Sequence, residues 1–243
     1  MFSLVREITE TFSSSQSSQL GLYGALGYDL TFQFERIDLK KEREGSQRDL
    51  VLYLPDEIIV VDNQKNDAWT VNFDFSKGDL STNGHPRTST PAPYAPAEAD
   101  QPFTARDAEP GAYARSVTLA KEQFRVGNLF EVVLSQVFRL RLSTAPSTVF
   151  RRLSKRNPSP YGYFMNLGRN EYLVGASPEM FVRVEKTKDG LRVETCPISG
   201  TIERGDSPLE DALQIKKLIQ SEKEESELTM CTDVDRNDKS YAE

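Results

Sequence analysis

Residues 130–142 read FEVVLSQVFRLRL and carry the clearest periodic signal in this 243-residue chain. Mostly apolar side chains occupy every second position from Phe130 to Leu142, while Glu131 and Arg139 fall on the opposite face. A two-residue period is typical of a half-buried β-strand. The stretch therefore predicts a strand with one face toward a core and the other toward solvent.

Further strands are expected on both sides of this stretch. Residues 50–61 and 68–75 are rich in residues that favour strands, and the polar run 62–67 between them predicts a hairpin. Glycines recur from Gly21 to Phe32 and indicate a strand that either contains bulges or closely approaches another backbone. Four more strands are expected around residues 161–167, 171–175, 180–185 and 191–196.

Helix signals occupy the remaining segments. Ser207 and Ser221 are each followed by a glutamate three residues later, which is the pattern of a capping box at a helix start. Helices are therefore expected after Ser207 and after Ser221, and also at residues 113–124 and 146–156. Together the patterns predict an α+β fold with mostly antiparallel sheets.

The composition excludes several function classes. The chain has 30 Lys and Arg against 37 Asp and Glu, a net charge of −7, which argues against nucleic-acid binding. No apolar run approaches the roughly 20 residues that span a bilayer, so no membrane association is expected. Two distant cysteines exclude a disulfide scaffold, and we expect a cytoplasmic protein. The single histidine, His85, argues against a histidine-dependent triad or a multi-histidine zinc site.

The expected domain organisation is simple. Residues 1–20 are helix-like and then rich in serine, which predicts a disordered or helical leader. Residues 21–243 form the main domain. Within it, residues 76–110 contain repeated prolines and turn signals and predict a long connector.

Acidic residues cluster on the last expected helix. Glu224 and Glu227 are three residues apart and share one helix face, an arrangement of carboxylates that suits Mg²⁺. The same residues also have a structural explanation, because acids stabilise a helix N-terminus and Glu224 is the expected capping partner of Ser221. Spacing alone favours the structural explanation.

Two further segments allow both a functional and a structural interpretation. Gly200 and Thr201 can offer a backbone N–H and a hydroxyl to an anion, or they can form an ordinary turn. The run from Asp233 to Asp238 alternates acids with Arg236, and we expect a structural network of arginine and carboxylates there.

Several motifs, in this order along the chain, resemble one family. The matching stretches are residues 21–29, 52–56, 127–136, 157–161, 175–179, 197–205 and 223–238. They are similar to the chorismate-utilising enzymes, specifically to the aminase subunit of anthranilate synthase, of the type often fused to its glutaminase. The resemblance implies a fold of mostly antiparallel sheets with helices packed outside.

The resemblance also implies a function and a site. The family's lyase converts chorismate and ammonia to anthranilate and pyruvate in tryptophan biosynthesis, using Mg²⁺ and ammonia from a glutamine amidotransferase. Glu227 matches a direct Mg²⁺ ligand, and Glu224 matches a second acid that holds the ion. Gly200 and Thr201 match catalytic positions that contact the substrate. The family's loop for tryptophan, its feedback inhibitor, matches Asn157, Pro158, Ser159, Pro160 and Tyr161.

Some alternatives stay open within and beyond this family. Aminodeoxychorismate synthases often carry a nucleophilic lysine where this chain has Ser199, and isochorismate synthases use a lysine elsewhere, so Ser199 favours anthranilate synthase. The family's enzymes are longer and supply a catalytic histidine and further acids from a second half. We therefore expect a truncated fragment that is inactive alone, or a remnant that only binds a partner. Exposed strand edges and apolar faces are expected to follow.

Overall fold

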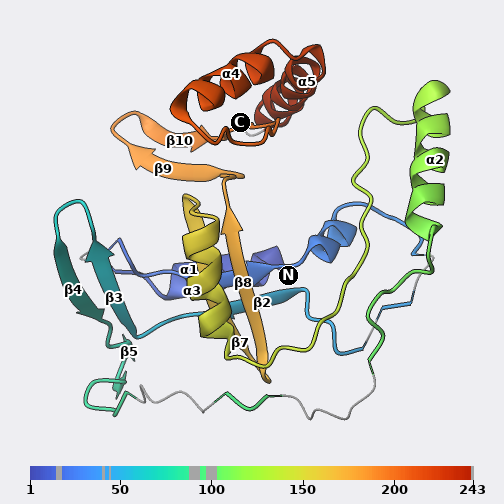
Figure 1. The fold of residues 1–243 in the computed structure, drawn as a ribbon. Helices are drawn as coiled ribbons and strands as arrows, with labels where there is room; N and C mark the ends of the chain where they lie inside the picture. Colours follow the sequence, from blue (N-terminus) through green and yellow to red (C-terminus); the bar gives the residue numbers. More distant parts are fainter. Residues whose placement is uncertain (15–17, 40–41, 44, 88–93, 97–102, 242–243) are drawn as a thin grey trace. The chain divides into compact units, whose positions relative to one another are not determined.

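The computed structural model describes residues 1–14, 18–39, 42–43, 45–87, 94–96 and 103–241 (Figure 1). It divides into two units. The first unit comprises Met1–Arg139 and Met165–Tyr172, and the second comprises Leu140–Phe164 and Leu173–Glu243. Both units mix helices with antiparallel strand pairs, which confirms the α+β prediction. No helix of the described residues is long and apolar enough to cross a membrane.

The first unit is built mainly from short strand pairs. Its elements are α1 (Phe2–Thr11), β1 (Tyr23–Leu26), the 3₁₀ helix η1 (Tyr28–Gln33), β2 (Leu50–Tyr53), β3 (Glu57–Asp62), β4 (Asp67–Asn72), β5 (Ser76–Lys77), β6 (Leu80–Ser81) and α2 (Ala112–Arg125). Strand β1 pairs with β2, β3 with β4, and β5 with β6, all antiparallel. The β3–β4 pair confirms the hairpin predicted around residues 62–67.

The turn of the β3–β4 hairpin is held by its own side chain. Asp62 Oδ1 accepts hydrogen bonds of 3.0 Å from the backbone N–H groups of Gln64 and Lys65. The Lys65 N–H bond is the main reason that the pKa of Asp62 lies below its ordinary value. Asn66 adopts a φ of 51°, a conformation that asparagine tolerates in tight turns. Local turn chemistry therefore sets the register in which Asp62 lies opposite Asp67.

Strands β1 and β2 approach each other closely at Gly24. Gly24 lies opposite Leu52, and a Cβ atom at position 24 would overlap the carbonyl oxygen of Val51. This confirms the close backbone approach predicted from the glycine-rich stretch.

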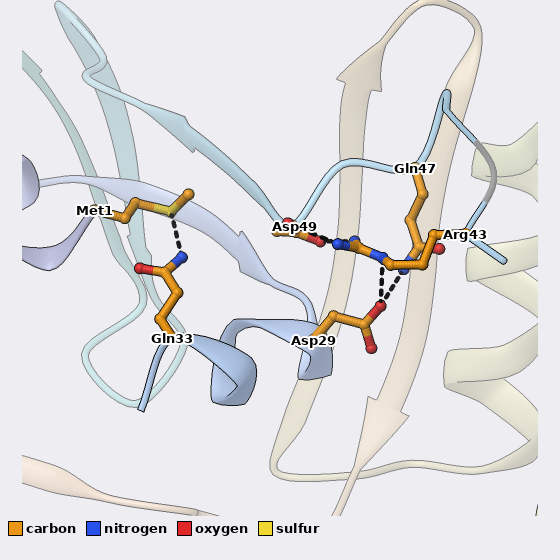
Figure 2. A network of polar contacts seen from close by, with 6 residues as sticks. All are labelled: Met1, Asp29, Gln33, Arg43, Gln47 and Asp49. Carbon is orange, nitrogen blue, oxygen red and sulfur yellow. Dashed lines mark hydrogen bonds and ion pairs between the residues drawn. The ribbon is translucent and has the colours of Figure 1, made fainter. Parts of the chain in front are cut away.

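A polar network fixes η1 to the segment that precedes β2. The Arg43 guanidinium pairs with Asp49 and lies 2.9 Å from Asp29 Oδ2, which also accepts a 2.9 Å hydrogen bond from Gln47 (Figure 2). Hydrogen bonding to Asp49 raises the pKa of Arg43 above its ordinary value. The network therefore links Asp29 of η1 to Arg43 and Gln47, and through Arg43 to Asp49.

The tip of the β7–β8 hairpin belongs to the first unit and is anchored to β2. Strand β7 spans Tyr161–Gly168 and β8 spans Glu171–Ser177. Arg48 donates a 2.6 Å hydrogen bond to the carbonyl of Leu167, and the Tyr53 hydroxyl donates a 2.8 Å bond to the carbonyl of Asn166. Leu167 is one of three buried apolar residues among the described positions, with Leu30 and Phe73.

The second unit holds helix α3 against the base of that hairpin. Its other elements are α3 (Pro146–Arg156), β9 (Arg183–Thr187), β10 (Gly190–Glu194), α4 (Pro208–Ile219) and α5 (Glu222–Lys239). The Phe150 ring of α3 stacks on Phe164 of β7, with 6.2 Å between ring centroids. Strands β9 and β10 pair as an antiparallel hairpin. The strands and helices predicted for this region are confirmed, with boundaries shifted by a few residues.

The strand predicted for residues 130–142 is wrong. Within the described residues this stretch forms a single β-bridge, between Phe138 and Arg106. Two backbone hydrogen bonds flank the bridge, from the Arg139 N–H to the Ala105 carbonyl and from the Asp107 N–H to the Val137 carbonyl. An alternating pattern marks which side chains could face a core, but a strand also needs a partner backbone along its length. Without one, the stretch is extended and its apolar side chains are exposed, with Leu140 at 91%.

The predicted domain boundaries remain a prediction. Helix α1 lies within the predicted leader, and residues 15–17 of that leader lie outside the described residues. Of the predicted connector 76–110, residues 88–93 and 97–102 also lie outside the described residues. The exposed apolar surface expected from the sequence is present, because Phe181 and Val133 are 90% and 85% exposed.

An ion pair fastens the loop before α4 to that helix. Arg204 donates hydrogen bonds of 2.6 Å and 2.5 Å to the two carboxylate oxygens of Asp211, which also accepts a 3.1 Å bond from the Gly205 N–H. These bonds, that of Arg204 foremost, hold the pKa of Asp211 below its ordinary value. The helix itself begins at the Ser207 cap, whose hydroxyl accepts a 3.3 Å bond from the Glu210 N–H, as predicted.

Replacing Gly24 with alanine is expected to destabilise the protein by about 1–3 kcal/mol, the usual cost of overpacking. The added methyl group would collide with the Val51 carbonyl and separate β1 from β2. Urea unfolding followed by circular dichroism measures the change. Gly21→Ala is the matched control, because a Cβ atom there meets no atom within 4 Å. Equal midpoints for the two variants would contradict the prediction.

Replacing Asp211 with asparagine is expected to lower the urea midpoint at pH 7. Because the folded pKa of Asp211 is depressed, its stabilisation is present above the unfolded-state pKa of about 3.9 and is lost as pH falls through the folded pKa. The difference from the original chain should therefore vanish in strong acid. Asp206→Asn, an exposed change in the same loop, serves as control. A difference that is independent of pH would rule out this origin.

Candidate functional site

The predicted catalytic and metal-binding residues lie on two segments of the second unit. Gly200 and Thr201 belong to the loop that follows β10, and Glu224 and Glu227 belong to the first two turns of α5. The structure brings Gly200, Glu224 and Glu227 into one neighbourhood. Thr201 follows Gly200 with an exposed side chain.

The capping-box explanation for Glu224 is only half right. The Ser221 hydroxyl accepts a 3.3 Å hydrogen bond from the Glu224 N–H, as predicted. The reciprocal bond is replaced, because the Ser221 N–H donates to the carbonyl of Leu218 at 3.2 Å. The carboxylate of Glu224 is therefore not used to close the helix N-terminus.

The Glu224 carboxylate instead lies against the backbone of the Gly200 loop. A Cβ atom on Gly200 would be 2.8 Å from Glu224 Oε2 and 3.4 Å from Leu218 Cδ1. Gly200 also has a φ of +88°, which glycine adopts without the strain that other residues meet. The backbone conformation therefore favours glycine at this position, and a larger residue would also push the Glu224 carboxylate aside.

Buried polar atoms without partners gather around this loop. Glu224 Oε2, Ser199 Oγ and Thr195 Oγ1 are buried and form no hydrogen bond within the described part of the chain. Burying a polar atom without a partner costs about 1–3 kcal/mol, and such atoms often mark a place where a ligand or an ion binds. The Gly200 loop and the start of α5 therefore have unused hydrogen-bonding capacity.

A lysine bridges the two predicted metal ligands. Lys223 Nζ lies 2.9 Å from Glu224 Oε1 and 2.9 Å from Glu227 Oε2. These bonds, that to Glu227 foremost, raise the pKa of Lys223 above its ordinary value. Both carboxylates thus present an oxygen toward one cation. Lys223 is not among the residues expected at the site from the sequence, although the four-residue spacing from Lys223 to Glu227 is a recognised signal for a helical ion pair.

The donor set fits a magnesium ion in part. Among the described residues, no group of three or more His, Cys, Asp or Glu side chains could hold a metal. Glu224 and Glu227 supply two carboxylates, and Mg²⁺ is commonly held by one or two carboxylates, with water and substrate oxygens completing its shell. The unpartnered Glu224 Oε2 is an oxygen of the kind that Mg²⁺ prefers.

The predicted inhibitor loop lies at the surface between α3 and β7. The N–H of Asn157 ends α3 by donating to the carbonyl of Leu153 at 2.8 Å, and the Ser159 hydroxyl donates to the Asn157 carbonyl at 3.3 Å. Tyr161 begins β7 and is 43% exposed. Within the described residues no hydrogen bond or ion pair joins this loop to the glutamates of α5.

The acidic run at the end of α5 contains one ion pair of the kind expected for a structural network. The Arg236 guanidinium donates hydrogen bonds of 3.0 Å and 2.8 Å to Asp233 Oδ1. This pair is on the helix surface and leaves the glutamates of the first two turns as the candidate cation ligands.

Comparisons with known proteins identify relatives of this chain. A relative named anthranilate synthase, from Azospirillum brasilense, is 50% identical over 242 residues, which are 98% of this chain and 32% of the relative. Anthranilate synthase component 1 from Thermus thermophilus is 33% identical over 223 residues, which are 90% of this chain and 47% of the relative. The chain therefore spans about a third to a half of the length of these relatives.

A solved structure has a similar fold. The crystal structure of anthranilate synthase component I from Streptococcus pneumoniae TIGR4 matches with a TM-score of 0.71 and 26% identity, over 97% of this chain and 54% of that one. A family model described as chorismate binding enzyme matches residues 2–240, a span that includes the Gly200 loop and helix α5. With a match over nearly its whole length, the chain belongs to the chorismate binding enzyme family.

Proposed function

We propose that this chain contributes the cation-binding carboxylates and part of the chorismate site to an anthranilate synthase. That enzyme is a lyase of tryptophan biosynthesis, which we place in the cytoplasm. The observation that carries the proposal is the Glu224 carboxylate, held beside Gly200 with Oε2 buried and without a partner in the described residues. A helix cap alone would not leave that oxygen unused.

Each residue of the site has a distinct role in this proposal. Glu227, which is 41% exposed, holds the ion directly, and Glu224 holds it from the side of the Gly200 loop. When bound, Mg²⁺ neutralises a carboxylate of chorismate and orients the ring. The Gly200 N–H and the Thr201 hydroxyl can donate to the same anionic substrate. The catalytic assignments of Gly200 and Thr201 rest on the resemblance and on their place beside Glu224.

The nucleophile in this proposal is ammonia itself. Ser199 has a hydroxyl where a lysine would supply an amine, so this position cannot form an amine adduct with the ring. Ammonia adds to the ring as the ring hydroxyl leaves as water. The enolpyruvyl side chain is then eliminated as pyruvate together with a ring proton, which leaves the aromatic amine. A glutamine amidotransferase, as a subunit or a fused domain, supplies the ammonia. Ser199 therefore favours anthranilate over the aminodeoxychorismate or isochorismate products of related enzymes.

A chimera tests the proposed activity. Residues 2–240 replace the matching segment of the Azospirillum brasilense relative, which is 50% identical. With chorismate, ammonium and Mg²⁺, the chimera is expected to form fluorescent anthranilate, and Glu227→Gln is expected to lower kcat/KM by about 100-fold or more. Loss of a group that orients a metal costs up to about that factor, and loss of a ligand costs at least as much.

The control is Glu225→Gln, which removes the same charge from an exposed position on the same helix turn. It is expected to keep most of the activity. Equal losses for the two variants would refute the role of Glu227, and a product other than anthranilate would refute the proposed reaction. The unfused chain, assayed in parallel, is expected to form no anthranilate, because two carboxylates hold Mg²⁺ weakly without the rest of a site.

We propose that the loop Asn157–Tyr161 contributes to binding of tryptophan as a feedback inhibitor. The loop is at the surface of the second unit, and Tyr161 exposes 43% of its area for contact with a ligand. L-tryptophan is expected to lower anthranilate formation by the chimera, while D-tryptophan has little effect. Replacing Asn157–Tyr161 by the corresponding number of glycine and serine residues should remove the inhibition. Unchanged inhibition after this replacement would exclude the loop.

A further inference from the structure

We propose that Lys223 is an internal counter-cation that competes with the divalent ion for Glu224 and Glu227. The inference rests on the proposed cation site and adds a residue that regulates its occupancy. Lys223 Nζ hydrogen-bonds one oxygen of each glutamate at 2.9 Å. A divalent ion held by these two carboxylates would lie close to this ammonium, and the repulsion between the two cations would oppose ion binding until the ammonium turned away.

The two glutamates differ in how they present their oxygens. Glu224 exposes 18% of its side chain and directs Oε1 to Lys223, while Oε2 is buried beside Gly200. Glu227 is 41% exposed and directs Oε2 to the same ammonium. Lys223 thus neutralises the pair from the solvent side and leaves the buried oxygen unbonded.

The bridging lysine can be displaced easily. Its side chain is 73% exposed and can turn into water. An exposed ion pair changes an equilibrium constant by at most about fivefold, so two such pairs hold the ammonium only weakly. Lys223 therefore reduces the affinity for a divalent ion without preventing its binding.

The same contact has a second consequence for stability. Glu224 and Glu227 are like charges on one helix face, and like charges so placed destabilise a helix. Lys223 relieves this repulsion until a divalent ion replaces it. Removal of Lys223 should consequently strengthen ion binding and also weaken the protein in the presence of a chelator.

The test measures Mn²⁺ binding to the full chain by electron paramagnetic resonance, with thermal unfolding as a second readout. Lys223→Met is expected to bind Mn²⁺ about three- to twentyfold more tightly, which is the range for loss of two exposed ion pairs. Its melting temperature should fall in EDTA and recover in saturating Mg²⁺. Lys223→Arg, which keeps the charge, should bind Mn²⁺ much like the original chain.

The matched control is Lys188→Met in the turn between β9 and β10. Lys188 is exposed and forms no ion pair within the described residues, and its replacement changes the net charge equally. Equal affinities for Lys188→Met and Lys223→Met would overturn the inference. Glu227→Gln separates the two proposals: if it binds Mn²⁺ as well as the original chain does, the cation site itself is wrong.

Discussion

The placement of the Glu224 carboxylate beside Gly200 is the constraint on which the candidate site depends. A Cβ atom at position 200 would be 2.8 Å from Glu224 Oε2, so the loop after β10 passes close to the first turn of α5. This placement also keeps Glu224 Oε2 from water without giving it a partner in the described residues. A buried carboxylate oxygen of this kind is unfavourable by itself, and the proposed cation would supply the partner that it lacks.

The charges at the start of α5 determine which groups can bind a cation there. The helix N-terminus stabilises nearby acids, and this permits several glutamates in the first turns. Because the Ser221 N–H is satisfied by Leu218, no glutamate is needed for the cap. The carboxylates of Glu224 and Glu227 are consequently available to a cation, and Lys223 is the cation of this chain that they bind.

Local signals predicted most of the second unit. Pro146, Ser207 and Ser221 mark helix starts through the missing N–H of proline or the hydroxyl of a cap, and helices begin at or directly after each of them. Hairpins were likewise predictable where turn residues separate two strands. The structure of residues 130–142 was not predictable in this way. Their alternating pattern shows which face is apolar, but it does not show whether a partner strand is present.

The site residues show the same division between local and long-range information. The spacing of Glu224 and Glu227 placed them on one face, but it could not decide between a cap and a cation site. That choice depends on Gly200, which lies 24 residues earlier and contacts Glu224 only in the folded chain. Two carboxylates on adjacent helix turns, supported by a glycine loop, favour a hard ion that keeps its own water ligands. An ion that requires a complete protein cage, such as structural zinc, would find too few donors among the described residues.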